Sequence, residues 1–223
     1  LTSYAPVYFI YNPHSSKVQA SFKYKLHRKY NLYIGYTHLI LWDLAEDSRP
    51  FLDVNYNPEV FYRWKTTNKI NLESVDLIPY GHVSNGKDGD DTRSLDYAGA
   101  QANFKFNLRR DRVLRTAVRV KYMGNFDQTN NTIREYSGPV ELRFSLTDFS
   151  KGIIDKAELT GRLYTGGTYG EDFSRGGQEI GINFRVMGVD ITPSFYLQYF
   201  HGYNESLRYF NEKEHIVRFG LLL

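Results

Sequence analysis

The stretch that decides the fold is KVQASFKYKLH, residues 17–27, because its polar and apolar side chains alternate without a break. Val18, Ala20, Phe22 and Tyr24 share one parity, while lysines and other polar residues take the opposite parity. Successive side chains of a β-strand point to opposite faces of the sheet. A strict period of two therefore predicts a strand with one apolar and one polar face.

The same alternation returns along the whole chain. It is clear in VELRFSLT, residues 140–147, and in IGINFRV, residues 180–186, and no amphipathic helical pattern stands out. Counting such runs predicts about twelve strands. Their expected ranges are 4–11, 17–28, 31–42, 51–65, 70–84, 95–107, 112–123, 138–148, 154–165, 177–187, 191–202 and 214–223.

The connections between these strands alternate in length. Short ones are expected near residues 28–30, 65–69, 108–111, 149–151 and 188–190. Longer ones are expected near residues 43–50, 85–94, 124–138, 165–176 and 203–213. Short turns at one end and longer loops at the other are typical of up-and-down barrels of the bacterial outer membrane. We expect a single barrel domain over residues 1–223, the simplest organisation for this length.

A soluble lipocalin-like barrel is the structural competitor, and it would place the apolar side chains inside. Three features favour a transmembrane antiparallel β-barrel. The strand count exceeds the roughly eight of lipocalins, most strands reach the roughly 9 to 11 residues of a tilted span, and tyrosines lie near many strand ends, as in an interfacial girdle. About twelve strands lie below the roughly 16 to 18 of open porins. We therefore expect Arg143 and Arg185 to pair with Glu141 and Glu158 inside a narrow lumen.

The composition excludes other classes of protein. The chain has no cysteine, which rules out a disulfide scaffold and thiolate metal sites. A formal net charge of +3 is too small to indicate a nucleic-acid partner. The sequence has no run of about 18 apolar residues that would form a membrane-spanning helix. It also shows no signal-peptide pattern, which leaves N-terminal trimming open.

One expected hairpin, YGHVSNGKDGDDTRSLD at residues 80–96, carries residue types that can perform chemistry. If the hairpin is symmetric about Gly89, His82 lies opposite Asp96, with Cβ atoms about 4.5 to 5.5 Å apart. Ser84 shares the face of His82 because it is two residues further on. A serine activated by a histidine that a carboxylate orients is the arrangement found in serine hydrolases.

The same loop offers oxygen ligands for a metal. Asp88, Asp90, Asp91 and Thr92 supply the hard oxygens that calcium (Ca2+) prefers. Either a bound cation or the backbone amide of Gly86 could stabilise an oxyanion. From the residues alone three interpretations stay open, namely a catalytic site, a calcium loop and a polar hairpin tip, since loops rich in Asp and Gly are commonly turns.

Parity also predicts the face on which the site lies. Asp96 shares its parity with an apolar run that ends at Phe106, so we expect it to point outward, toward lipid. An ionisable group facing lipid is unusual and indicates function. Ser74 and Asp76 would share that outward face unless the register changes. Pro79 predicts a bulge that changes it.

Three segments carry a resemblance to a known family. HVSNGKDGDDTRSLD at residues 82–96 resembles the active-site hairpin of the outer membrane phospholipase A family, and RPFLDVNYNPEVFYRW at 49–64 and GYNESLRYFNE at 202–212 also resemble that family. The resemblance implies calcium-dependent hydrolysis of acyl esters of phospholipids and lysophospholipids, with A1, A2 and lysophospholipase activity. It further implies a homodimer in the outer membrane, with a lipid-facing site toward the outer leaflet.

The resemblance also implies roles for individual residues. Ser84 would be the nucleophile, His82 the general base and then acid, and Gly86 the amide donor of the oxyanion hole. The family's triad asparagine is replaced by Asp96, which would still orient His82. His38 falls at a polar position of the family's dimer interface.

The implied calcium ligands come from two subunits. They are a backbone carbonyl at Lys87, a hydroxyl at Thr92 and a carbonyl at Ser48 of the partner subunit. An acidic ligand used by some family members aligns with Gly89 of this chain, so a neighbouring acid would replace it. The candidates are Asp88, Asp90 and Asp91. The alternative from another class is a small porin or adhesive outer-membrane barrel without catalysis, in which this hairpin is only a surface loop.

Overall fold

The computed structural model describes residues 1–67, 71–109, 112–126, 130–147, 154–186 and 193–223. Two short 3-10 turns, η1 (Gly89–Asp91) and η3 (Ile133–Glu135), accompany the strands. No helix in these ranges is long and apolar enough to cross a membrane. The strands are β1 (Thr2–Ser3), β2 (Tyr8–Tyr11), β3 (Ser16–Lys25), β4 (Leu32–Trp42), β5 (Phe51–Lys65), β6 (Leu72–Ser84), β7 (Ser94–Asn107), β8 (Val113–Gly124), β9 (Val140–Thr147), β10 (Ile154–Gly166), β11 (Asp172–Val186), β12 (Ser194–Gly202) and β13 (Glu214–Leu222).

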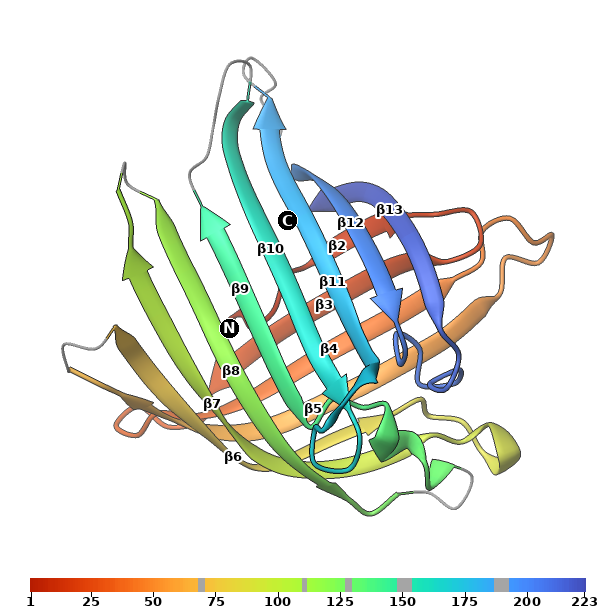
Figure 1. Cartoon of the computed structure of the whole chain (residues 1–223), viewed down its shortest axis with the longest axis horizontal. Coiled ribbons are helices and arrows are strands. Elements are labelled where there is room, and N and C mark those ends of the chain that lie inside the picture. Colours follow the sequence, from red (N-terminus) through yellow and green to blue (C-terminus); the bar gives the residue numbers. More distant parts are fainter. Residues whose placement is uncertain (68–70, 110–111, 127–129, 148–153, 187–192) are drawn as a thin grey trace.

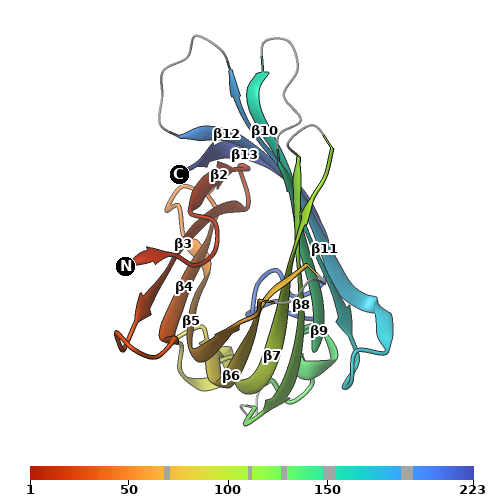
Figure 2. The same ribbon diagram turned by 90° about the vertical axis from the view of Figure 1, so that its left-hand side faces the viewer.

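All of these strands belong to one antiparallel sheet that closes into a barrel (Figures 1 and 2). Neighbours in sequence are neighbours in the sheet from β3 to β13, and the barrel closes because β2 pairs with both β13 and β3. β2 falls within the first expected strand, residues 4–11, and the two-residue β1 pairs further along the same edge of β3, so the predicted twelve-stranded antiparallel barrel is confirmed. The predicted range of β5 matches the observed one.

Two expected boundaries are wrong by more than three residues, and β3 ends at Lys25 rather than at residue 28. The first strand is interrupted after β1, where the Tyr4 hydroxyl turns into the lumen and donates to Glu59. β11 begins at Asp172 rather than near residue 177, because a register shift beyond Tyr164 lets Gly166 pair with Asp172. The loop between β10 and β11 is therefore shorter than expected. The turns expected near 65–69, 108–111, 149–151 and 188–190 lie wholly or partly outside the described residues.

Polar side chains fill the lumen and apolar ones cover the exterior, as the alternation predicts. Inside, Glu141 on β9 and Arg218 on β13 are only 2% and 1% exposed. Outside, Val120 on β8 and Phe219 on β13 are 54% and 50% exposed. Several charged groups inside are paired, for example Arg63 with Asp76 at 2.6 Å. The expected Arg143–Glu141 pair is present, and Glu158 accepts a hydrogen bond from Asn183 at 2.9 Å.

The loops that follow β6, β8, β10 and β12 lie at one end of the barrel (Figure 1). The loop of residues 203–213 folds inward and supplies Leu207 and Phe210 to a buried cluster with Leu95 and Tyr97. Glu205 of the same loop accepts hydrogen bonds from buried cations inside the lumen. This loop thus packs across the end of the barrel at which the residue 80–96 hairpin lies.

Candidate active site

A bulge in β6 sets the orientation of the candidate site. The pairing of β6 with β7 shifts by one residue across positions 78–81, which include Pro79. Before the bulge, Asp76 is buried in the lumen at 2% exposure. After it, His82 and Ser84 have the same parity but lie on the exterior, because an extra residue in one strand reverses the faces. The predicted bulge is present.

His82 and Asp96 face each other across β6 and β7. They are register partners, and Nδ1 of His82 lies 2.7 Å from Oδ1 of Asp96. The two side chains are 33% and 24% exposed, whereas Leu95 and Tyr97 on either side of Asp96 are buried inside. Asp96 therefore lies on the barrel exterior. With Nδ1 bonded to the carboxylate, Nε2 of His82 is left for another partner.

Two further side chains hold the Asp96 carboxylate, and the sequence analysis did not identify them. The Tyr80 hydroxyl donates to Oδ1 at 3.1 Å, and the Asn125 amide donates to Oδ2 at 2.6 Å. Tyr80 could have been found from its shared parity with His82. Asn125 follows β8, whose last residue, Gly124, pairs with Asp96, so only the strand pairing reveals it. The carboxylate is thus fixed by hydrogen bonds from three directions.

Ser84 lies two residues beyond His82 on the same face. Its register partners are Tyr56 on β5 and Ser94 on β7. Over the described residues, no hydrogen bond joins its hydroxyl to His82. Nucleophile and base are commonly further apart in a free enzyme than in its substrate complex. The position suits a nucleophile that engages Nε2 of His82 when substrate binds.

Gly86 adopts a backbone conformation that favours glycine, with φ of 64°. A Cβ atom at this position would lie 2.9 Å from the ring of Tyr56, so glycine also leaves room for that side chain. No acceptor for the Gly86 N–H is found among the residues that the structure describes. A backbone amide of this kind beside Ser84 is a candidate oxyanion donor.

Asn85 organises the loop, and the sequence analysis missed this role. Its side chain is 3% exposed, and its amide donates to the Asp91 carbonyl at 2.8 Å. Its Oδ1 accepts the Arg93 N–H at 3.0 Å, while its own N–H donates to the Arg93 carbonyl at 3.0 Å. One inward-facing amide thus fixes the turn that carries the candidate oxyanion donor and the candidate metal ligands.

The carboxylates of the loop do not form a metal cluster. Asp88, Asp90 and Asp91 are exposed, and Asp91 is already bound by Arg208, with an N–O distance of 3.0 Å. Within the described ranges, no group of three or more His, Cys, Asp or Glu side chains is placed to hold a metal ion. The hard oxygens of the loop suit calcium. A site would combine them with main-chain and hydroxyl oxygens.

The other expected ligands lie in two loops. Lys87 and Thr92 flank η1 in the loop after β6, with partly exposed side chains. Ser48 is exposed in the loop between β4 and β5.

The fold and the site together define a class of protein, an antiparallel β-barrel with a candidate serine-hydrolase site on its exterior. The sequence model of the family described as phospholipase A1 matches residues 6–223. The chain therefore belongs to the phospholipase A1 family, and the resemblance to outer membrane phospholipase A is confirmed.

Individual relatives agree with this assignment. Phospholipase A1 of Escherichia coli strain K12 is 28% identical over 85% of this chain and 61% of that protein. The putative phospholipase A1 of Neisseria meningitidis serogroup B is 25% identical over 93% of this chain and 54% of that protein. The chain thus spans between 54% and 61% of the length of these curated relatives.

Solved structures match the barrel over nearly its whole length. Outer membrane phospholipase A from Escherichia coli superposes with a TM-score of 0.80 at 23% identity, covering 99% of this chain and 90% of that chain. The Salmonella typhi outer membrane phospholipase, a dimer with bound calcium, gives a TM-score of 0.79 at 24% identity, covering 99% and 91%. These likenesses confirm the fold.

Proposed function

We propose that the chain is an outer-membrane phospholipase that hydrolyses acyl esters of phospholipids and lysophospholipids at a site facing the outer leaflet. The observation that carries the proposal is the 2.7 Å contact between His82 and Asp96 on the barrel exterior, beside Ser84. Family membership supports the substrate class. A site on the apolar exterior of a barrel meets lipid directly, so a phospholipid need not leave the bilayer to react.

In the first half of the reaction, the Ser84 hydroxyl attacks the ester carbonyl carbon while Nε2 of His82 takes its proton. The Gly86 N–H stabilises the oxyanion of the tetrahedral intermediate. His82 then gives the proton to the departing alcohol oxygen, which leaves the acyl group on Ser84. In the second half, His82 deprotonates a water molecule that attacks the acyl-enzyme. Fatty acid leaves and Ser84 regains its proton.

Asp96 orients the imidazole and stabilises its charged form while the proton resides on it. Tyr80 and Asn125 are positioning residues, because they contact Asp96 rather than the reacting atoms. Their donated hydrogen bonds also offset the cost of a carboxylate at the lipid-facing surface. These hydrogen bonds therefore allow Asp96 to stand where the family has an asparagine.

We propose calcium as the cofactor, since bound calcium would add positive charge near the oxyanion. The Lys87 carbonyl, the Thr92 hydroxyl and Ser48 of the partner subunit would hold it. Asp88 or Asp90 is a better acidic ligand than Asp91, because Arg208 already binds the Asp91 carboxylate. The calcium bound in the Salmonella typhi relative supports this part of the proposal.

We propose that two copies associate through the exterior beside the site. An aromatic strip runs there from β3 to β5. Tyr36 packs on Phe22 at 5.4 Å and its hydroxyl lies 3.0 Å from Nδ1 of His38, whose ring contacts Tyr56 at 5.0 Å. Tyr56 is the register partner of Ser84. Substrate acyl chains would then lie along the seam between subunits, and the dimeric Salmonella typhi relative supports this arrangement.

The test is hydrolysis of phospholipid in detergent micelles, with calcium or with a chelator. We expect Ser84→Ala to lower turnover by at least about a thousandfold, because the acyl-enzyme cannot form. Ser94→Ala, at the register partner of Ser84, is the matched control and should remain active. Turnover that survives Ser84→Ala would refute the assigned site. A native protein with no hydrolysis in calcium would favour the non-catalytic barrel.

A further inference from the structure

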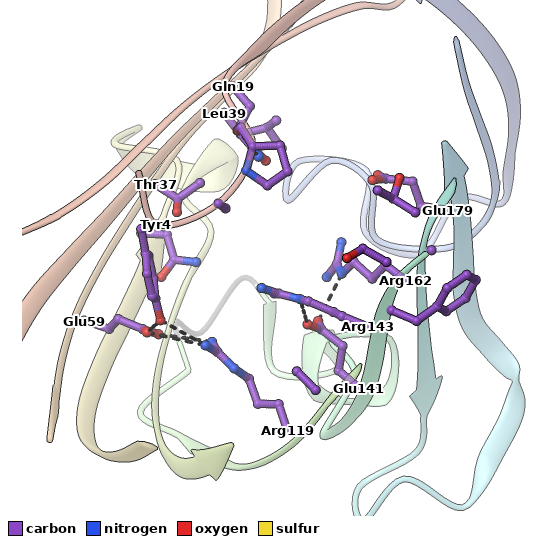
Figure 3. Close-up of a pocket in the computed structure, with 18 of the residues that line it drawn as sticks. Tyr4, Gln19, Thr37, Leu39, Glu59, Arg119, Glu141, Arg143, Arg162 and Glu179 are labelled. Carbon is purple, nitrogen blue, oxygen red and sulfur yellow. Dashed lines mark hydrogen bonds and ion pairs between the residues drawn. The ribbon is translucent and has the colours of Figure 1, made fainter. Parts of the chain in front are cut away.

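The lumen holds a cavity of about 620 Å³ whose wall is unevenly charged (Figure 3). On β8, β9 and β10 the charged lining side chains are mainly cations. The cations of this wall are Arg115, Arg119, Lys121, Arg143 and Arg162, and its carboxylates are Glu141 and Glu158.

Some of these charges are already satisfied. Arg119 donates to Glu59 at 3.1 Å, to Gln101 at 2.8 Å and to the Tyr4 hydroxyl at 3.0 Å. Glu179 on β11 is the register partner of Arg162 and is bound by Lys17 at 2.9 Å. The carboxylates that Arg119 and Lys17 bind, Glu59 and Glu179, are therefore already paired.

Arg143 and Arg162 are directly opposite each other in the pairing of β9 with β10. Like charges placed in this way destabilise a sheet unless an anion lies between them. Both residues donate through Nε to one carboxylate, Glu141, as Figure 3 shows. Over the described part of the chain, their terminal Nη groups have no acceptor. One carboxylate thus neutralises half of the charge of the pair.

These guanidinium groups are open to the cavity. The Arg143 and Arg162 side chains are 41% and 35% exposed, whereas Glu141 beneath them is 2% exposed. Lys121 lines the same cavity, and its backbone N–H pairs with Pro139 just before β9. Its Nζ donates to the Ser137 carbonyl at 3.2 Å and lies 5.7 Å from the centre of the Tyr97 ring, and no carboxylate among the described residues forms an ion pair with it.

We propose that Lys121, Arg143 and Arg162 form an anion site inside the barrel, which takes a small soluble oxyanion of the phosphate class. Guanidinium groups match phosphate oxygens with paired N–H donors, and a lysine adds a point charge. Inorganic phosphate and a soluble phosphomonoester share this chemistry. The site faces the lumen, on the opposite side of the sheet from the exterior face that carries Ser84, so it stands independently of the proposed hydrolysis.

The experiment is calorimetric titration of inorganic phosphate into the detergent-solubilised protein, with chelator and at constant ionic strength. We expect saturable binding in the native protein that matched chloride does not reproduce. Arg143→Gln and Lys121→Gln should each weaken binding about tenfold, the loss of one charge-assisted contact. Glu141→Gln should tighten binding, because it frees both guanidinium groups. Lys25→Gln, at the exposed last residue of β3 and outside the cavity lining, should leave binding unchanged.

Two outcomes would overturn the proposal. One is that the native protein shows no saturable phosphate binding. The other is that Lys121→Gln, Glu141→Gln and Arg143→Gln all bind phosphate as the native protein does. The opposite signs expected for Glu141→Gln and Arg143→Gln separate a site from general damage to the barrel. Lys121→Gln breaks no ion pair between described residues, so it keeps the test valid if an arginine variant fails to fold. A parallel titration with glycerol phosphate distinguishes free phosphate from a phosphomonoester as the tighter ligand.

Discussion

Asp96 is the residue on which the candidate site depends most, because it fixes the ring of His82. It receives hydrogen bonds from Tyr80 and Asn125 as well, so both of its oxygens are engaged. A carboxylate bonded in this way keeps one orientation. With Nδ1 of the imidazole bonded to Asp96, Nε2 is left for another partner.

Substitutions of Asp96 distinguish its role in orienting the His82 ring from the effect of its negative charge. We expect Asp96→Asn to retain most of the turnover, because the amide oxygen can still accept from Nδ1 of His82. Asp96→Ala should lower kcat by about a hundredfold or more, a typical contribution of positioned acid–base catalysis. Thermal unfolding should change little, since the site is partly exposed. Equal losses of activity and stability in Asp96→Ala would make Asp96 a structural residue.

The local sequence pattern was sufficient to predict that His82, Ser84 and Asp96 lie on one face of the hairpin. Parity and hairpin symmetry predict their shared face, and the structure has that arrangement. Asn125 could not be found in this way, because it comes from the next hairpin and reaches Asp96 only through the pairing of β7 with β8. Contacts within one hairpin follow from spacing, whereas contacts between hairpins require the register of the sheet.

The bulge in β6 decides which of its side chains face outward. Its extra residue reverses the parity between Asp76 inside and His82 outside. Deletion of Pro79 should restore a regular strand and turn His82 and Ser84 into the lumen, because a slip of one residue exchanges the two faces. We expect this deletion to abolish hydrolysis. Pro79→Ala, which keeps the extra residue, is the matched control. Full activity of the deletion variant would contradict the role of the bulge.

The loop of residues 203–213 is anchored by Glu205. Burial by itself would raise the pKa of Glu205, but the charges of Lys17 and Arg218 outweigh it and lower the pKa to about 2. Because this folded-state pKa lies below the ordinary value of 4.5, the ion pairs stabilise the loop above that value. Their contribution is lost as the pH falls from about 4.5 toward 2.

Unfolding measured against pH tests this anchor. We expect Glu205→Gln to destabilise the barrel by about 3 to 5 kcal/mol at neutral pH, because it leaves the buried Arg218 without its carboxylate and Lys17 with Glu179 alone. The variant should also lose much of the acid dependence between pH 4.5 and 2. Glu212→Gln, on an exposed residue of the same loop, is the control. If the native protein and Glu205→Gln showed the same dependence of unfolding on pH, Glu205 would not anchor the loop.

Period-two alternation was enough to predict the strands, but not every departure from regular pairing. The range of β5 follows from its pattern, and β11 was placed too late because its first residues include glycines that resemble a loop. The break between β1 and β2 depends on hydrogen bonds of the Tyr4 hydroxyl with Glu59 and Arg119, which come from other strands. The inward fold of the loop of residues 203–213 likewise depends on partners from distant strands.

The whole molecule places apolar surface outside and charge inside, which is the reverse of a soluble barrel. This arrangement follows from the sequence once closure of the sheet is assumed, because parity assigns each side chain to one of two faces. It also explains why a catalytic group on the exterior would meet lipid, while the lumen cations would meet soluble anions. The two proposed sites use opposite faces of one sheet.

The most direct measurement is covalent labelling of the intact barrel in phospholipid micelles with calcium, using an alkyl sulfonyl fluoride and peptide mass spectrometry. We expect the label on Ser84, loss of hydrolysis in proportion to labelling, and no label in the His82→Ala variant, because only an activated serine reacts readily. A label on a different residue, or full hydrolysis by protein labelled at Ser84, would contradict the assignment of Ser84 as the nucleophile.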